Sequence, residues 1–349
     1  MSHHQLRVAI AGATGYTGLE LLRILAGHPG AKVIRVTSQA QAGAPLAEAC
    51  PHLRGLYDLT LEPLDRETIA ADADVVFACL HTGEAPTLAP PVLGAGATLI
   101  DLGPDFRLKD PGDYAQWYGQ AHAAPALLPE AVYGLSELAR PQLPGAKLIA
   151  NPGCYPTACL LALAPLAAAG LVARPPVLDC KSGVSGAGRV PTARTHFCEV
   201  HGTASAYGLP RHRHTPEIEQ GLKTFGCDLP VSFTPHLLPM GRGILATVYV
   251  DPGKDVDAAT IAGIYQDFYA GSPCIRLKPP GQLPTTGDVL ATNFCDLGSV
   301  WDDRTGRIVA VTAIDNLGKG AAGQAIQNMN LAWGLPELTG LLTAAPYGG

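Results

Sequence analysis

The architecture of this chain follows from a segment near its start, Arg7-Val8-Ala9-Ile10-Ala11-Gly12-Ala13-Thr14-Gly15-Tyr16-Thr17-Gly18. Its first five residues predict a buried strand, and apolar residues then recur at helical spacing as far as Gly27. Lys32 to Thr37 predicts the next strand. A strand, a helix and a strand in this order imply a right-handed crossover and a parallel sheet.

The glycines of this segment predict a dinucleotide site. Gly12, Gly15 and Gly18 permit a tight turn and a close approach of a pyrophosphate to the N–H groups at the helix start. A glycine-rich turn can be purely structural, but a strand before it and a helix after it favour dinucleotide binding. The residues expected to contact the cofactor here are Gly12, Thr14, Gly15, Tyr16, Thr17 and Gly18.

The end of the second strand favours NADP over NAD. Thr37-Ser38-Gln39 contains no Asp or Glu where an NAD enzyme places a carboxylate on the ribose 2′-hydroxyl. No Arg immediately follows the strand, so Ser38 is the expected donor to a 2′-phosphate. NAD remains the alternative.

The pattern of elements divides the chain into two domains. Further strands are predicted at 74–80, 98–102 and 147–150, so residues 1–152 should form a Rossmann-type, doubly wound parallel sheet that binds NADP. Residues 153–315 are β-rich, with a helix near 257–269, and predict an α+β catalytic and oligomerisation domain with a largely antiparallel sheet. A C-terminal helix over residues 316–349 is expected to complete the first domain.

Composition excludes several classes of protein. Of 349 residues 47% are hydrophobic, the net charge is -6, and no run of five or six like charges occurs, which argues against disorder and against nucleic-acid partners. The uncharged stretch between Lys147 and Arg174 is interrupted by Pro and Gly, so no membrane span is predicted. No export signal is recognised and the nine cysteines form no Cys-x-x-Cys pair, so we expect a cytoplasmic protein with mostly reduced core thiols.

A second motif, Asn151-Pro152-Gly153-Cys154-Tyr155-Pro156-Thr157, predicts a nucleophile. It places Cys154 at a strand-to-helix turn, where the helix dipole should stabilise a thiolate. Pro156 suits the first turn of that helix. The alternative, that Cys154 is another buried core thiol, holds better for the other cysteines.

A third motif, His212-Arg213-His214-Thr215-Pro216-Glu217, predicts a general base. Both imidazoles project the same way if the segment is extended, and Glu217 is placed to orient one of them. A solvated basic loop is the structural alternative. Zinc binding by Cys198, His201, His212 and His214 is a further alternative, but the spacing fits no structural zinc pattern, and no metal is expected.

Together these motifs resemble the N-acetyl-gamma-glutamyl-phosphate reductase family of arginine biosynthesis, over nearly the whole chain. Further segments that carry the resemblance are Asp105-Phe106-Arg107, Ser182-Gly183-Val184-Ser185-Gly186-Ala187-Gly188-Arg189, Arg242-Gly243-Ile244 and Asp315-Asn316-Leu317-Gly318-Lys319-Gly320-Ala321-Ala322-Gly323. The resemblance implies a glyceraldehyde-3-phosphate-dehydrogenase-like fold, a homodimer or homotetramer, and a semialdehyde dehydrogenase type of oxidoreductase. Such an enzyme uses NADPH to reduce an acyl phosphate to N-acetyl-glutamate 5-semialdehyde with release of phosphate.

The resemblance also assigns roles. Cys154 would form a thioester and His212 would act as acid and base, paired with the thiolate. The guanidinium fork suits the substrate carboxylate and phosphate, and which arginine binds which anion is open. Substrate-binding or supporting positions are Arg107, Arg189, His214, Glu217 and Arg242. Ser185, Gly186 and Asn316 are expected near the cofactor.

Three other functions remain as alternatives. A sister group in lysine biosynthesis acts on a carrier-protein-bound aminoadipyl phosphate, and its Cys and Ser-Gly motifs match less well. A cysteine hydrolase that uses Cys154 and His212 would leave the glycine motif unexplained. A protein that only senses NADP would leave the cysteine and histidine motifs unexplained.

Overall fold

The computed structural model describes residues 5–346, which divide into two compact units. The first unit comprises the chain up to Pro152 together with Ala321–Leu342. The second comprises Gly153–Gly320 and the segment from Thr343 onward. Each unit is described by itself.

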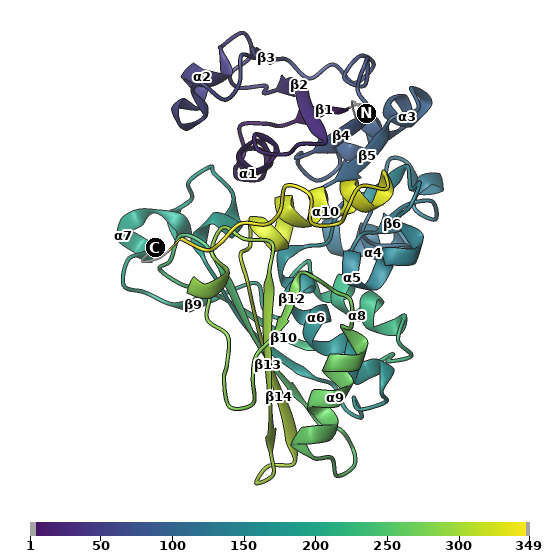
Figure 1. The fold of residues 1–349 in the computed structure, drawn as a ribbon, viewed down its shortest axis with the longest axis vertical. Coiled ribbons are helices and arrows are strands. Elements are labelled where there is room, and N and C mark those ends of the chain that lie inside the picture. The colour runs from purple at the N-terminus through teal and green to yellow at the C-terminus, as the bar shows by residue number, and fades with distance from the viewer. Residues whose placement is uncertain (1–4, 347–349) are drawn as a thin grey trace. The chain divides into compact units, whose positions relative to one another are not determined.

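The first unit is built on a seven-stranded parallel sheet with the order β3-β2-β1-β4-β5-β7-β6 (Figure 1). The strands are β1 (Leu6–Ala11), β2 (Ala31–Thr37), β3 (Leu61–Glu62), β4 (Val75–Ala78), β5 (Thr98–Asp101), β6 (Val132–Tyr133) and β7 (Leu148–Ala150). The five central strands match the predicted ones. Because β1 lies between β2 and β4, the strand order reverses at its carboxyl end, where open α/β sheets bind their ligands.

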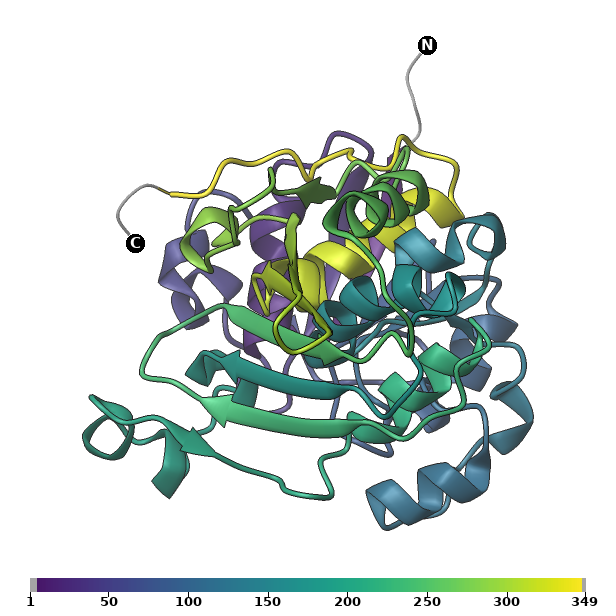
Figure 2. The ribbon, with the colours of Figure 1, turned by 90° about the horizontal axis from the view of Figure 1, so that it is seen from below.

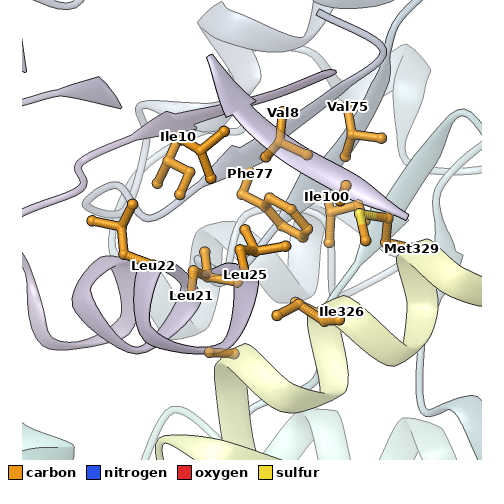
Figure 3. Packing of buried hydrophobic residues seen from close by; sticks show 14 of the residues in the cluster. Val8, Ile10, Leu21, Leu22, Leu25, Val75, Phe77, Ile100, Ile326 and Met329 are labelled. Carbon is orange, nitrogen blue, oxygen red and sulfur yellow. The ribbon is translucent and has the colours of Figure 1, made fainter. Parts of the chain in front are cut away.

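Side chains alternate between the two faces of this sheet, and helices cover both faces. Val8 and Ile10 of β1 face α1 (Tyr16–Leu25) and α10 (Gly323–Ala332), whereas Ala9 and Ala11 face α3 (Ala85–Gly94). Figure 3 shows Leu21, Leu22 and Leu25 of α1 and Ile326 and Met329 of α10 packed around Phe77 and Ile100. Burial of each such large side chain contributes roughly 1.5–3 kcal/mol. The remaining helices are α2 (Leu46–Ala49), α4 (Pro111–Tyr118) and α5 (Ser136–Ala139).

The last helix is shorter than predicted. A π-helical turn over Gly318–Ala322 precedes α10, and α10 ends at Ala332 rather than continuing toward the C-terminus. Gly334 adopts a positive φ of 67°, and Pro336 follows it, so the helix cannot continue. Residues 347–349 of the predicted range lie outside the described residues.

The second unit contains a mixed seven-stranded sheet with the order β12-β13-β14-β11-β8-β10-β9 (Figures 1 and 2). Four neighbouring pairs are antiparallel, and β8–β10 and β12–β13 are parallel. The strands are β8 (Val177–Ser182), β9 (Ser205–Ala206), β10 (Ser232–Leu237), β11 (Ile244–Val250), β12 (Ile275–Leu277), β13 (Cys295–Asp302) and β14 (Arg307–Ile314). The presence of one parallel sheet and one largely antiparallel sheet, each in its own unit, confirms the predicted fold class.

Helices cover one face of this second sheet. They are α6 (Cys154–Ala168), α8 (Thr215–Lys223) and α9 (Ala258–Phe268), with the short α7 (Phe197–Val200) in the connection before β9. α6 packs against β11 and β14 and is buried on all sides except at its ends. Among residues 5–346, no helix is both long enough and apolar enough to cross a membrane.

Candidate active site

At two positions of the turn between β1 and α1, only glycine fits beside the neighbouring backbone of the protein itself. Gly12 adopts a positive φ of 79°, and a Cβ there would collide with the carbonyl oxygen of Cys79. A Cβ on Gly18 would lie 2.6 Å from the carbonyl oxygen of Gly12. At Gly15, which caps α1, the nearest atom would be 3.7 Å away, an ordinary contact. Packing within the protein therefore leaves room for a larger side chain at position 15. The backbone N–H groups of the first turn of α1 follow this position directly.

Two of the predicted cofactor residues meet beside this turn. The Thr14 and Ser38 hydroxyl oxygens are 2.8 Å apart, and Ser38 follows directly after β2. The Thr37 side chain accepts a hydrogen bond from Gly12 N–H, so β2 also fixes the start of the turn. Ser38 is 4% exposed, and its hydroxyl is already bonded. A 2′-phosphate at this position would have to share or displace the Thr14 contact.

Arg107 is buried in a loop of the first unit and donates hydrogen bonds to two backbone carbonyls there. Its Nε donates to the Asn151 carbonyl at 2.8 Å, and its Nη2 donates to the Leu102 carbonyl at 2.9 Å. Asp105 accepts hydrogen bonds from the Gly83 N–H and the Tyr114 hydroxyl. Two N–H groups of the predicted substrate arginine thus hold the ends of β5 and β7.

Asp101, at the end of β5, is fully buried. Its Oδ1 accepts a hydrogen bond from Gly103 N–H, while its Oδ2 has no hydrogen-bond partner among the described residues. Burial, and then the nearby charge of Asp105, raise the pKa of Asp101 to about 7. This carboxyl group is therefore substantially protonated at neutral pH.

Cys154 is the first residue of α6, as predicted, and Gly153 is its N-cap. The Gly153 N–H donates to Oε1 of Glu217 at 2.8 Å, and Glu217 is fully buried in α8. A Cβ on Gly320 would be 2.9 Å from the Cys154 Cβ, so the Gly320 backbone packs directly against the cysteine. The thiol therefore lies at a helix N-terminus, where the Glu217 carboxylate bonds the preceding residue and the Gly320 backbone packs against the cysteine.

His212 lies in an aromatic cluster that includes the residue after Cys154. Its ring centroid is 5.8 Å from that of Tyr155, 5.5 Å from Tyr207, 5.2 Å from Phe233 and 4.9 Å from His214. Burial, with a smaller effect of the Arg213 charge, lowers the pKa of His212 to about 4. The His214 N–H donates to Nδ1 of His212 at 3.1 Å, so the proton of the neutral ring is on Nε2.

These contacts refine two expectations about the histidines. The orienting partner that the structure gives His212 is the backbone N–H of His214, while Glu217 bonds the nucleophile turn. A neutral imidazole also differs from the expected imidazolium paired with a thiolate, because burial disfavours the charged ring. As for zinc, no group of three or more potential ligand side chains within residues 5–346 is placed to hold a metal ion.

Three predicted segments converge in the second unit. Asn316 donates from Nδ2 to the Ser185 hydroxyl at 2.9 Å and accepts the Gly243 N–H at 2.7 Å. Gly186 lies beside the same amide. Arg242 forms an ion pair with the buried Asp315, with Nη2 2.8 Å from Oδ1. Arg189, by contrast, lies in an exposed stretch after Gly188.

Sequence reasoning missed several residues of this site. Tyr155 and Tyr207, whose hydroxyl oxygens are 3.0 Å apart, were not singled out, nor were Asp315 and Gly320. Tyr155, Asp315 and Gly320 are inside the motifs quoted for the resemblance, so their signal was present. Tyr207 and Phe233 carry no local signal, because only the folded sheet brings them to His212.

Comparison with known proteins places the chain in a family. Residues 7–146 match the family model of the semialdehyde dehydrogenase NAD binding domain, and residues 154–316 match that of the semialdehyde dehydrogenase dimerisation domain. An N-acetyl-gamma-glutamyl-phosphate reductase from Symbiobacterium thermophilum is 53% identical over 98% of this chain and 99% of the relative. The chain belongs to the N-acetyl-gamma-glutamyl-phosphate reductase family. The family prediction is confirmed.

A second relative of that name, from Desulforudis audaxviator, is 49% identical to this member of the reductase family, again over 98% of this chain and 99% of the relative. Among solved structures, aspartate semialdehyde dehydrogenase II from Vibrio cholerae has a TM-score of 0.71 at 20% identity, covering 94% of this chain and 98% of that one. Aspartate semialdehyde dehydrogenase from Candida albicans has a TM-score of 0.65 at 14% identity, covering 94% and 98%. These structures show that the N-acetyl-gamma-glutamyl-phosphate reductase family member has the semialdehyde dehydrogenase, glyceraldehyde-3-phosphate-dehydrogenase-like fold.

Proposed function

We propose that this protein reduces N-acetyl-gamma-glutamyl phosphate to N-acetyl-glutamate 5-semialdehyde with NADPH, releasing phosphate, in arginine biosynthesis. The observation that carries the proposal is Cys154 at the N-terminus of α6, with His212 in the ring cluster around Tyr155. Relatives that are about half identical over nearly their full length bear this name. A cysteine hydrolase would need the same pair but not the glycine turn after β1.

The β1–α1 turn fits NADP. Packing within the protein does not explain the glycine at position 15, and the N–H groups at the start of α1 that follow it suit a pyrophosphate. The neighbouring candidates for cofactor contact are Thr14, Tyr16, Thr17 and Ser38. When bound, NADPH supplies a hydride to the acyl carbon. On this proposal residues up to Pro152, with α10, form the cofactor domain and residues 153–315 form the catalytic domain. Ser185, Gly186 and Asn316 serve the cofactor side of the catalytic domain.

Cys154 and His212 perform the covalent step. The Cys154 sulfur attacks the acyl carbon, forms a thioester and displaces inorganic phosphate, which carries away the thiol proton. The N–H groups at the start of α6 stabilise the oxyanion, and Glu217 fixes that start by accepting the Gly153 N–H. His212 donates from Nε2 to the oxygen that becomes the hemithioacetal hydroxyl, and recovers a proton when the aldehyde leaves.

The carboxylate and the phosphate of the substrate are both anions that arginine side chains bind well. Arg242 is the best supported, because the Asp315 carboxylate holds its guanidinium in one place. Arg107 and Arg189 are the other candidates, and His214 supports His212 through its backbone. The match to a dimerisation domain supports a homodimer or homotetramer, and we expect a cytoplasmic enzyme with no nucleic-acid or membrane partner.

The reverse reaction tests the function directly. Protein is mixed with N-acetyl-glutamate 5-semialdehyde, phosphate and NADP, and the absorbance of the reduced nicotinamide is followed. Phosphate-dependent reduction supports the proposal, and a comparison with NAD measures the cofactor preference. Folded protein that gives no signal with either cofactor would overturn the proposal and direct attention to the carrier-bound aminoadipyl substrate.

Replacing the nucleophile separates binding from chemistry. Cys154→Ser should retain NADPH binding, measured by fluorescence titration, and lose nearly all turnover. Cys159→Ser, five residues further along α6 and buried, is the matched control and should retain turnover if it folds. Retained activity in Cys154→Ser would show that another residue is the nucleophile.

A further inference from the structure

Asp315, directly after β14, is a buried carboxylate that accepts five hydrogen bonds. Its Oδ1 accepts from Arg242 Nη2 at 2.8 Å and Nε at 3.2 Å, and from the N–H groups of Leu317 and Gly318, each at 2.8 Å. Its Oδ2 accepts from Ala291 N–H at 2.6 Å. The side chain is 0% exposed. Such a fully bonded buried carboxylate fixes the groups that donate to it.

The first of those groups is the guanidinium of Arg242. Two of its N–H groups point at one oxygen of Asp315, which limits the rotation of a side chain that is otherwise flexible and 23% exposed. The neighbouring residues reinforce the link, because Gly243 N–H donates to Asn316 Oδ1 at 2.7 Å. Asp315 and Asn316 therefore hold Arg242 and Gly243 as a pair.

The second group is the turn that contacts the nucleophile. Leu317 and Gly318 donate to the Asp315 side chain, and Gly320 N–H donates to the Asp315 carbonyl at 2.9 Å. This turn presents Gly320 to Cys154 so closely that no Cβ fits between them. The position of the turn beside the thiol thus depends on the same carboxylate.

The third group is Ala291, which adopts a positive φ of 56°. A non-glycine residue in this region is strained, and persists only where its surroundings hold it. The bond from its N–H to Asp315 Oδ2 supplies such a restraint.

We propose that Asp315 is a positioning residue for the reaction, which holds Arg242 toward the substrate anion and the 317–320 turn against Cys154. The inference rests on the proposed function. Asp315 itself is buried and acts through these residues without touching the substrate.

Asp315→Asn is the main test in the full-length enzyme. Asparagine keeps an acceptor for Leu317 and Gly318, but it removes the charge opposite Arg242 and turns an NH₂ group toward Ala291 N–H. We expect kcat/KM for the acyl phosphate to fall about 100-fold, with a raised KM and a lowered kcat, and NADPH affinity to stay within about twofold. Glu337→Gln is the matched control, because Glu337 pairs with Arg140 in the first unit through two bonds of 3.0 and 3.2 Å. This control should keep wild-type kinetics.

A readout independent of turnover tests the contact with the nucleophile. The rate of Cys154 alkylation by iodoacetamide, followed by mass spectrometry, should change several-fold in Asp315→Asn and remain unchanged in Glu337→Gln. A purely structural role for Asp315 would lower thermal stability but leave KM and the alkylation rate at wild-type values, and this result would overturn the proposal. If the wild type itself does not turn over the acyl phosphate, the proposed function fails, and the alkylation comparison still decides whether Asp315 positions Cys154.

Arg242→Lys tests the same link from the other side, and it leaves the buried carboxylate and its backbone donors in place. We expect KM to rise at least about tenfold with the Cys154 alkylation rate unchanged. In the double variant that combines Arg242→Lys with Asp315→Asn, the two effects on KM should not add, because both substitutions break the same ion pair between Arg242 and Asp315. A wild-type KM in Arg242→Lys, or full additivity, would overturn the link, and this variant remains informative even if Asp315→Asn fails to fold.

Discussion

Burial acts in opposite directions on two ionisable side chains of this enzyme. It lowers the pKa of His212 to about 4 and raises that of Asp101 to about 7, because each environment disfavours the charged form. At neutral pH His212 is therefore uncharged, and about half of the Asp101 carboxyl groups keep their proton. The two groups lend themselves to direct titration.

For His212, we expect the imidazole to remain neutral from pH 8 down to about pH 5.5, whereas an ordinary histidine is half protonated near 6.5. The measurement is an NMR titration of carbon-labelled histidines, with the His212 signal assigned by its loss in His212→Asn. That variant should also lower turnover by about 10²–10⁴-fold without weakening NADPH binding. A His212 signal that shifts with a midpoint near pH 6.5 would contradict the prediction.

For Asp101, the folded protein keeps a proton that the unfolded chain releases near pH 4. Its contribution to stability therefore declines as the pH rises from about 4 to about 7. Asp101→Asn cannot titrate, so its stability relative to the wild type should increase by about 1–3 kcal/mol between pH 5 and pH 8. Thermal and urea unfolding at both pH values provide the comparison, and a difference that is independent of pH would rule out the raised pKa.

The identities of single site residues were predictable where a motif marks them. Cys154 and His212 stand out by residue type and context. The hydrogen bond from Gly153 N–H to Glu217 could not be predicted, because it joins segments far apart in the sequence. The same reason explains Tyr207 and Phe233, which reach His212 only through the pairing of β9 and β10. Burial, which sets the pKa of His212 and Asp101, also arises only in the folded chain.

Among the secondary-structure elements, the β1–α1 turn permits the sharpest test, since its glycines have different reasons to be glycine. Gly15→Ala adds a methyl group that meets only ordinary contacts inside the protein, so the fold should survive while NADPH binds at least about tenfold more weakly. Fluorescence titration with NADPH and thermal unfolding measure the two effects.

Gly12→Ala is the matched control for this turn. It forces an alanine into φ 79° against the Cys79 carbonyl and should destabilise the protein itself, by about 2 kcal/mol or more. Wild-type NADPH affinity in Gly15→Ala would show that the turn is structural only.

Strands with a continuous apolar run were predicted, and strands without one were not, among them the eight-residue β13 (Cys295–Asp302). The apolar runs of β1, β2, β4 and β5 carry enough residues for a pattern, whereas β3, β6 and β9 have two residues each. The C-terminal helix was predicted over 316–349, but it ends at Ala332, and Gly334 follows it with a positive φ.

In the whole molecule, the first unit is completed by residues from the far end of the chain. Ile326 is fully buried in the core that also contains Phe77 and Ile100 (Figure 3). Ile326→Ala should lower the free energy of unfolding of this unit by about 2–4 kcal/mol. Urea unfolding measures the loss, and the partly buried Leu331→Ala should cost less. Equal effects of the two substitutions would show that α10 is not part of this core.

The discontinuity of the first unit has a consequence for the protein as it is being made. Between Pro152 and Ala321 a ribosome must add nearly 170 residues, which at roughly 5–20 residues per second takes about ten to thirty seconds. Throughout that interval the face of the sheet that carries Phe77 and Ile100 lacks α10. The nascent chain thus exposes an apolar surface until α10 has been made, and a holding chaperone is most useful to this protein in that window.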